Sequence, residues 1–379
     1  MLPLSYALRN LSRRAVRTAL TLLGVGLVAF LVILMTGFAT GLDASVSGSA
    51  RPDVAYVLGS AGETDLVRSF ITMGAAQEAA QAAPGVLEIG GRRAASVELH
   101  SESRMGDEIV LVRGVTDAAW LVHPEVTLVE GVEPRGAFEL MVGRLAAARM
   151  GVPDATLGVG RTLRLENRDW KIVGRFAAPG TVLEAETWAR LEDLMSATRR
   201  VDVSCTVLRL TSPDRLPDVQ LWAARNVRLE LTATTATKLY GALRGALAPV
   251  ASLAWLMAAL VLVGGLFACA NTMFAAVLVR TREMGTLRAI GYGPAAIGVS
   301  LLEESLLLGV AGGLLGFLAA SAAGEVALRF PSGAFVLDLG SGVRLFGLAA
   351  AAAAGLLGGL VPAIRAVRIP LPLALGGRP

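Results

Sequence analysis

Residues that could carry out catalysis are few, and their spacing suits no catalytic or metal-binding motif. The chain of 379 residues contains two cysteines, Cys205 and Cys269, and two histidines, His100 and His123. It has no G-x-S-x-G, H-E-x-x-H or C-x-x-C sequence, and these four residues follow no metal-ligand spacing. The sequence therefore predicts a protein that is not an enzyme, with no metal, no cofactor and no disulfide.

Binding of ATP in the P-loop manner would require a phosphate-binding loop, which this sequence lacks. Its two lysines, Lys171 and Lys238, both lie outside any G-x-x-x-x-G-K-[ST] sequence, in which the lysine and the backbone amides hold the phosphates. If the protein uses ATP, we expect another polypeptide to bind it.

Two adjacent acids, Glu303 and Glu304, are the acids expected at membrane depth, about two turns inside an apolar helix. Ionisable residues in such a position commonly have a role in transport or ion movement. These two are close to the expected membrane surface, so they could equally extend to the interface or pair with Arg288. The structural and the transport interpretations both remain open at this stage.

Four windows contain no charged residue over a membrane-spanning length, namely residues 18–42, 245–279, 305–324 and 345–364. A hydrocarbon core of about 30 Å takes roughly 20 helical residues. The first window has 25 residues, more than the apolar part of a cleaved signal peptide, which is the alternative interpretation. We expect an α-helical membrane protein with four transmembrane helices and a large α+β extracytoplasmic domain inserted between helices 1 and 2.

The distribution of arginines predicts the orientation of these helices. Ten arginines and one acid flank the spans at the two ends of the chain and between the second and third spans, whereas residues 42–244 carry 23 basic and 26 acidic residues. Short flanks rich in arginine stay in the cytosol. We therefore expect both termini in the cytosol of a bacterium, a multi-pass protein in its inner membrane, and the large domain in the periplasm or outside the cell. The basic excess does not indicate a nucleic-acid partner.

These observations predict the order of segments along the chain. The expected segments are a cytosolic amphipathic lead-in (1–17), transmembrane helix 1 (18–42), a periplasmic α+β core domain (43–240), a stalk with transmembrane helix 2 (241–279), a cytosolic coupling helix or loop (280–294), transmembrane helix 3 (295–324), an outer loop (325–344), transmembrane helix 4 (345–364) and a cytosolic tail (365–379). The second apolar window is too long for the bilayer, so the helix must tilt, break near Pro249 or project outward as a stalk, which we favour.

Within the large domain, alternation and turn residues predict strands at 53–58, 108–115, 162–166, 171–176, 204–210 and 227–232. Helical spacing predicts helices at 75–83, 143–150, 187–195 and 214–225. Residues 162–176 should form a hairpin that turns around residues 167–169.

Glycines in the third and fourth apolar windows recur at small-xxx-small spacing, which lets helix backbones approach closely in lipid. They are Gly312, Gly313, Gly316, Gly355 and Gly359. The spacing fits packing inside one bundle and also fits a subunit interface.

Residues 280–291 read RTREMGTLRAIG, and residues 301–316 read LLEESLLLGVAGGLLG. Both resemble the FtsX-like domain of MacB-type ABC permeases. The ending PAIRAVRIP (362–370), the start of the first span (17–24) and the segments LMVGR (140–144) and WKIVG (170–174) are also similar to that family. The resemblance covers nearly the whole chain and is most specific at 280–316.

The resemblance implies a permease subunit of a mechanotransmission (type VII) ABC transporter without a fused ATPase domain. Its implied partners are a separate ABC ATPase subunit, a second permease copy in a homodimer or heterodimer, membrane lipid, and in some relatives a periplasmic adaptor and an outer-membrane channel. ATP hydrolysis would then drive export or extraction of a lipidic or amphipathic substrate. The alternative is a signalling protein that activates a periplasmic partner without transport; a stand-alone sensor or channel would leave the 280–316 pattern unexplained.

The segment that matches best is also the segment expected to contact the ATPase. The expected coupling residues are Arg280, Arg282, Glu283, Met284, Gly285, Leu287, Arg288 and Gly291. Helical spacing places Met284 and Leu287 on one face. We expect that face to be exposed and to insert into a groove of the ATPase, with the charged residues fixing the register.

Overall fold

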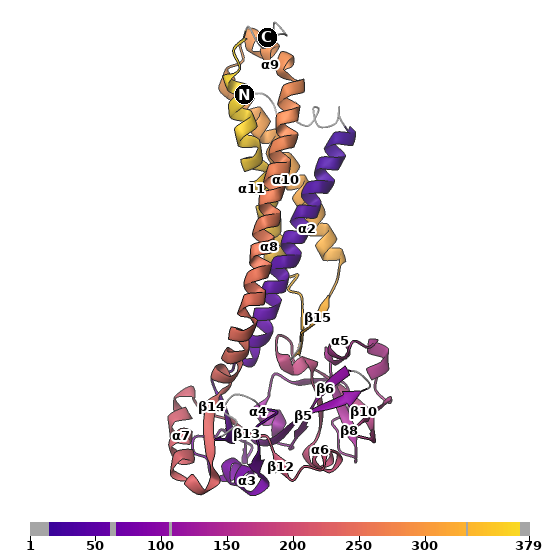
Figure 1. The fold of residues 1–379 in the computed structure, drawn as a ribbon, viewed down its shortest axis with the longest axis vertical. Helices are drawn as coiled ribbons and strands as arrows, with labels where there is room; N and C mark the ends of the chain where they lie inside the picture. Colours follow the sequence, from indigo (N-terminus) through magenta and orange to yellow (C-terminus); the bar gives the residue numbers. More distant parts are fainter. Residues whose placement is uncertain (1–14, 61–65, 106–107, 331–332, 372–379) are drawn as a thin grey trace. The chain divides into compact units, whose positions relative to one another are not determined.

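The computed structural model describes residues 15–60, 66–105, 108–330 and 333–371 (Figure 1). The chain forms two compact units. The helical unit comprises Met1–Thr40, Val250–Val326 and Leu337–Pro379, and the α+β unit comprises Gly41–Pro249 and Ala327–Val336. Most of the expected lead-in (1–14) and the end of the expected tail (372–379) lie outside the described residues.

Four helices in the described part of the chain are long and apolar enough to cross a membrane, namely α2 (Ala15–Ser49), α8 (Ala236–Val279), α10 (Pro294–Ala322) and α11 (Ser341–Arg368). This confirms the predicted fold class, with the large α+β unit inserted between the first two helices. Each helix begins before its charge-free window, because the charged residues that precede the windows, namely Arg17, Arg244, Glu304 and Arg344, are compatible with helical backbone.

Helix α8 has 44 residues and continues through Pro249, so the predicted alternative of a break at that proline is wrong. Residues 236–249 of this helix belong to the α+β unit. A proline inside a helix removes one backbone hydrogen bond, which the rest of a long helix tolerates.

Glycines on α10 allow close contact with α2 of the same chain. A Cβ atom built on Gly312 would lie 2.6 Å from the side chain of Val25, and one built on Gly316 would lie 2.6 Å from Cβ of Ala29. Both distances are shorter than real Cβ contacts. Gly313 instead faces α11, at 2.8 Å from Leu348 Cδ1.

The glycines of α11 pack on α10 in the same way. A Cβ on Gly355 would lie 2.7 Å from the carbonyl oxygen of Ser305, and one on Gly359 would lie 2.5 Å from the side chain of Ser305. The Ser305 hydroxyl also donates a hydrogen bond to the carbonyl oxygen of Gly355. All five predicted packing glycines therefore contact helices of their own bundle, which favours the intrachain interpretation over a subunit interface.

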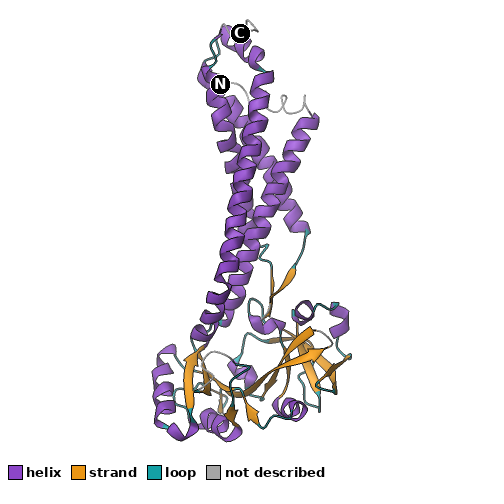
Figure 2. Ribbon diagram, viewed as in Figure 1, coloured by secondary structure: helices purple, strands orange, loops and turns teal. Residues whose placement is uncertain are grey.

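The α+β unit is built on a ten-stranded mixed sheet (Figure 2). Its strand order is β14 (Leu231–Thr235), β1 (Val54–Gly59), β13 (Cys205–Arg209), β5 (Ala95–Met105), β6 (Glu108–Val115), β11 (Thr187–Arg190), β8 (Glu139–Gly143), β10 (Arg168–Ala177) and β7 (Thr127–Gly131), with β9 (Thr162–Leu165) paired to β10. Neighbouring strands are antiparallel except for β11 with β6 and β10 with β8. Small two-stranded pairs are β2 (Ile71–Thr72) with β12 (Asp202–Val203) and β3 (Glu88–Ile89) with β4 (Arg92–Arg93).

Short helices pack on this sheet and complete its core. They are α3 (Met73–Ala82), α4 (Ala119–Val122), α5 (Ala146–Met150), α6 (Leu191–Thr198) and α7 (Leu216–Arg225). The helix predicted at 75–83 is α3, which begins earlier because the hydroxyl of Thr72 accepts a hydrogen bond from the Ala75 amide. Trp170, which is fully buried, belongs to the same apolar cluster as residues of α3, α6 and α7.

Three local predictions are wrong in type or boundary. The helix predicted at 187–195 is the strand β11 followed by α6, because Thr187, Trp188 and Ala189 are buried between β6 and β8. The strand predicted at 227–232 begins as a 3₁₀ turn and becomes β14 at Leu231. The helix predicted at 143–150 starts at Ala146, after β8 ends.

The hairpin predicted at 162–176 is confirmed as β9 and β10, but its turn lies earlier than expected. Glu166 and Asn167 have φ values of 51° and 58°, so both are in the left-handed region. Positive φ at both central residues matches the right-handed twist of the two strands. Arg168 already pairs with Leu165 in the ladder.

The segment between α10 and α11 forms the hairpin β15 (Ala327–Phe330) and β16 (Gly333–Val336), which belongs to the α+β unit. Ala334 is fully buried beside Leu145 and Ala185 of that unit. The residues between the third and fourth apolar helices and those between the first and second therefore fold together.

Candidate functional site

The expected coupling segment contains a short helix, α9 (Thr281–Ala289), whose apolar face is buried in its own chain. Met284 is only 7% exposed and packs with apolar residues of α8, α10 and α11, with Leu287 half-buried at the edge of the same cluster. The prediction that Met284 and Leu287 form an exposed docking face is therefore wrong. Helical spacing correctly predicts that Met284 and Leu287 share one face of α9. It does not show that α8, α10 and α11 cover this face.

The opposite face of α9 and the turn after it are exposed. Arg282, Glu283 and Thr286 are exposed, and so are Ile290 at 72% and Tyr292 at 38%. This charged surface with two apolar side chains can bind a soluble partner. Gly291 ends the segment with φ of 107°, a conformation that side-chain-bearing residues rarely adopt.

A buried ion pair fixes the start of α9 to α10. The Arg280 guanidinium donates to Glu304 Oε2 at 2.7 Å, and both side chains are less than a tenth exposed. Arg280 Nε also lies 3.5 Å from Glu283. One of the two predicted intramembrane acids thus pairs with Arg280 and not with Arg288. Oε2 of the other, Glu303, is buried and has no hydrogen-bond partner among the described residues.

Arg288 and Gly285 secure the rest of the segment. The Arg288 guanidinium donates to the carbonyl oxygen of Ile369, the residue after α11. Gly285 is buried beside Met284. The helix α9 is therefore joined to α10 and to the end of α11 by charged contacts and by an apolar contact, while its outer face is exposed.

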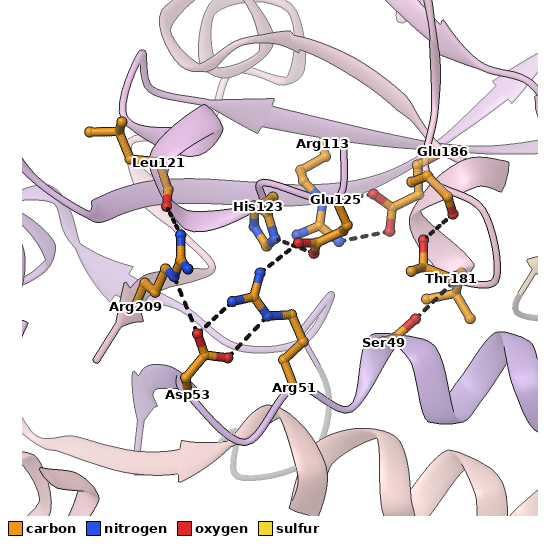
Figure 3. A network of polar contacts seen from close by, with 12 residues as sticks. Ser49, Arg51, Asp53, Arg113, Leu121, His123, Glu125, Thr181, Glu186 and Arg209 are labelled. Carbon is orange, nitrogen blue, oxygen red and sulfur yellow. Dashed lines mark hydrogen bonds and ion pairs between the residues drawn. The ribbon is translucent and has the colours of Figure 1, made fainter. Parts of the chain in front are cut away.

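A second candidate site lies in the α+β unit, where the chain leaves α2 (Figure 3). It is a group of linked ion pairs that we call the ion network, formed by Arg51, Asp53, Glu98, Arg113, His123, Glu125, Glu186 and Arg209.

Arg113 on β6 is the buried centre of the ion network. Its Nε and Nη2 donate to the two oxygens of Glu186, each at 2.7 Å, and its Nη1 donates to Glu98 Oε2 at 2.7 Å. Sheet order explains the arrangement, because β6 lies between β5, which carries Glu98, and β11, which begins one residue after Glu186. Trp188 on β11 donates its indole N–H to Glu186.

His123 links this buried centre to the outer part of the ion network. Its Nε2 lies 3.1 Å from Glu98, and its Nδ1 lies 3.5 Å from Glu125. Glu125 in turn accepts a hydrogen bond from Arg51 at 2.7 Å. Arg51 follows the last residue of α2, Ser49, by two positions, so the ion network ties the chain just after this helix to the centre of the sheet.

Further hydrogen bonds hold the same junction. Asp53 accepts hydrogen bonds from Arg51 and from Arg209 of β13, and Arg209 also donates to the carbonyl oxygen of Leu121 at 3.4 Å. The hydroxyl of Ser49 accepts a hydrogen bond from the Val182 amide at 2.9 Å.

Charges in the ion network shift the protonation of its members. Burial alone would raise the pKa of Glu98, but the Arg113 guanidinium and then His123 hold that pKa well below its usual range. Burial would likewise lower the pKa of His123, yet the Glu98 carboxylate raises it. The pKa of Glu125 falls to about 2, against the effect of burial, because it pairs with His123 and Arg51. The four carboxylates thus lie among three guanidiniums and His123.

One group of possible ligand atoms lies beside Arg113. The side chains of Glu98, His100 and Cys205 place their ligand atoms within 4.8 Å of one another. Arg113 already forms an ion pair with Glu98, and its positive charge would repel a metal cation bound at these atoms. Burial raises the pKa of the Cys205 thiol and, with Arg113, lowers the pKa of His100. The group is better described as part of the packed centre of the sheet than as a metal site.

Sequence reasoning missed the ion network. It treated His100 and His123 as isolated residues and made no prediction for Arg113. The available signal was a charged residue inside an apolar strand, as in EIVLVRGV of β6, because an arginine there is buried only when acids neutralise it.

Comparisons with known proteins agree with this architecture. The family profile described as the MacB-like periplasmic core domain matches residues 18–223, and the profile described as the FtsX-like permease C-terminal matches residues 255–371. No curated protein matches the chain.

Two solved structures are similar to the chain at low identity. The periplasmic region of MacB from Actinobacillus actinomycetemcomitans has 9% identity and a TM-score of 0.38, over 52% of this chain and 95% of that one. The extracellular domain of the noncanonic ABC-type transporter YknZ from Gram-positive bacteria has 10% identity and a TM-score of 0.36, over 48% of this chain and 98% of that one.

Proposed function

Because the chain belongs to the MacB/FtsX-like family of ABC transporter permeases, we propose that it couples ATP hydrolysis on a separate ATPase subunit to movement of its α+β unit. The movement would drive export or extraction of a lipidic or amphipathic substrate. The observation that carries the proposal is that α9 has two different faces. One face is charged and exposed, and the other is buried against α8, α10 and α11.

The proposed contact with the ATPase is the exposed face of α9 and the turn after it. Arg282 and Glu283 would set the register, and Ile290 and Tyr292 would supply apolar contact. A force on this face reaches the long helices through Met284 and through the Arg280–Glu304 pair. A change of ATPase state can shift the permease between two states only if it binds them with different affinity, and this surface is where that difference would arise.

At the other end of α2, the ion network would convert displacement of the helix into displacement of the sheet. Arg51 lies two positions after the helix, and its contacts continue through Glu125 and His123 to Glu98. The His123–Glu98 contact is buried and breaks only at high cost, and the partly buried Arg51–Glu125 pair extends it to the chain after α2, so the junction should move as one body.

The proposed location is the cytoplasmic membrane of a bacterium, with both termini and α9 in the cytosol. Two observations support this orientation. The flanks of the spans are rich in arginine, and the chain between α2 and α8 folds into one unit with the hairpin between α10 and α11, so both connections must lie on the same side of the membrane. A Ser60→Cys variant should react with a membrane-impermeant maleimide on cells whose outer membrane alone has been opened. Labelling that also requires opening of the inner membrane would contradict this orientation.

A second permease copy would complete the transporter. Since the five glycines of α10 and α11 already pack inside the bundle, the copy would have to use other surfaces, such as the exposed apolar residues Leu20, Leu23 and Leu27 of α2. Native mass spectrometry of the complex with its ATPase tests this, and a single permease chain per complex would contradict it.

The coupling proposal is tested with Arg282→Glu and Ile290→Asp in the full chain, co-purified with its ATPase. We expect both variants to insert and fold normally, because both side chains are exposed, but to lose the ATPase or its stimulation. Arg164→Glu is a matched control, since this arginine is 72% exposed in the α+β unit. Normal ATPase recovery and normal stimulation in both α9 variants would show that this face is not the coupling surface.

A further inference from the structure

A cleft of about 560 Å³ opens on the α+β unit beside α4. Its apolar part is formed by Trp120 and Leu121 of α4 with Val115, Pro134 and Ala189, and charged residues surround it. A volume of roughly 300–1,000 Å³ is typical of sites for small organic ligands.

We propose that this cleft binds an amphipathic organic anion, such as a carboxylate attached to an aromatic or aliphatic body, and that the ligand acts on the ion network through α4. The inference rests on the proposed function and names a ligand class for it. It adds a binding site outside the helical unit and outside the ion network.

The charged rim selects for an anion. Three arginines, Arg92, Arg135 and Arg190, face the two acids Asp117 and Glu133, so positive charges exceed negative ones by one in the lining. Arg135 is 88% exposed and lies 4.0 Å from Glu133, a separation at which a solvated pair is weak. Arg92 forms no ion pair with any residue that the structure describes. These two guanidiniums can bind a carboxylate by charge-assisted hydrogen bonds.

Trp120 gives the apolar part of the ligand a flat surface and connects it to the interior. Its ring lies 5.5 Å from the ring of Trp188, measured between centroids. Trp188 donates to Glu186, and its ring lies 5.6 Å from the His123 ring and 5.6 Å from the Arg113 guanidinium carbon. A ligand that packs on Trp120 is therefore one side chain away from the buried centre of the ion network.

Helix α4 has a second contact with the junction. The carbonyl oxygen of Leu121, which also lines the cleft, accepts a hydrogen bond from Arg209. His123 caps the end of the same helix, with its backbone N–H donating to the Ala119 carbonyl. Filling the cleft should thus restrain α4, His123 and the residues they hold, including Arg51 through Glu125.

The test uses the full chain in lipid nanodiscs, without ATPase, and isothermal titration calorimetry. The probe is 1-naphthaleneacetate, and its matched cation is 1-naphthylmethylammonium; empty nanodiscs give the background from partition into lipid. We expect saturable binding of the anion only. Arg92→Gln and Arg135→Gln should each weaken it about tenfold, as expected for loss of a hydrogen bond to a charged group. Arg164→Gln should leave it unchanged.

Hydrogen exchange on the same samples tests the connection to the ion network. We expect the bound anion to slow exchange of the backbone amides between residues 121 and 126, excluding Pro124, which has none. Thermal melting checks that each variant is folded. The Arg135→Gln variant should fold normally, because the Arg135 side chain is almost fully exposed.

Three results would overturn the inference: no binding of the anion above background, equal binding of the cation, or wild-type affinity in both arginine variants. Unchanged exchange at 121–126 in the bound protein would overturn the action on the ion network. These results leave the proposed function standing, because no ATPase is present. Failure of the α9 variants to affect the ATPase would contradict the proposed function while leaving anion binding intact.

Discussion

Replacement of Arg113 by Met tests the ion network most directly, because it removes the cation and keeps most of the side-chain volume. In the native chain the guanidinium makes three hydrogen bonds of 2.7 Å to two buried carboxylates. Without it, Glu98 and Glu186 remain buried without their shared cation. Removing one partner of a buried ion pair costs about 3–5 kcal/mol. For a unit of this size each kcal/mol lowers the melting temperature by about 2–4 °C, so we expect a loss of roughly 6–20 °C.

The pH dependence of the melting temperature gives a second, independent test of this prediction. In the native chain the folded pKa of Glu98 lies below its unfolded value, so its stabilising contribution is present above about pH 4.5 and is lost as the pH falls toward the folded pKa. In Arg113→Met, burial without the cation should raise the pKa of both carboxylates, so the variant loses most stability near neutral pH. The difference in melting temperature between the two proteins should therefore shrink as the pH falls below about 5.

The assay is thermal unfolding of the full chain in detergent, followed by tryptophan fluorescence at neutral and acid pH. Arg164→Met is the control, because that arginine is 72% exposed. Adding Glu98→Gln and Glu186→Gln to Arg113→Met should recover part of the loss, since no buried charge is then left unpaired. A loss under about 1 kcal/mol, or a loss of the same size at every pH, would refute the argument.

Four further predictions concern single side chains. His123→Asn should remove one pH-dependent contribution to the free energy of unfolding. Against the effect of burial, Glu98 raises the folded pKa of His123, so this contribution is complete below about pH 6.5 and disappears as the pH rises through the folded pKa. Melting curves of wild type and variant over this pH range should show the difference. Met284→Asp should lower the melting temperature of the full chain rather than only uncouple it, because the side chain is 7% exposed; an unchanged melting curve would contradict this. Glu304→Leu should destabilise by about 3–5 kcal/mol because the buried Arg280 guanidinium loses its carboxylate partner on α10, and Glu304→Gln by less, as unfolding in denaturant would measure. Gly316→Leu should prevent α10 from packing on α2 and reduce the yield of folded protein, whereas Gly324→Leu, which meets no atom within 4 Å but has φ of 67°, should have the smaller effect.

The sequence by itself determined the membrane architecture and the family. Charge-free windows predict spanning helices because hydrocarbon excludes unpaired charges and requires every backbone group to bond within its own helix. The pattern around α9 and α10 carried the family resemblance, and the arginine flanks gave an expected orientation. These signals are local in the chain, so they can be read without knowledge of the fold.

Only the tertiary structure decided which residues meet. Arg113 and Glu186 are 73 positions apart in the chain, and Arg51 and Glu125 are 74 apart, so no periodicity reveals that they pair. Met284 was placed on the correct face of its helix, but whether that face meets solvent or other helices depends on Val277, Ile297 and Ala363, which lie in three other helices. Helical spacing fixes the direction of a side chain relative to its own helix, whereas burial and charge pairing depend on what the rest of the chain places opposite it.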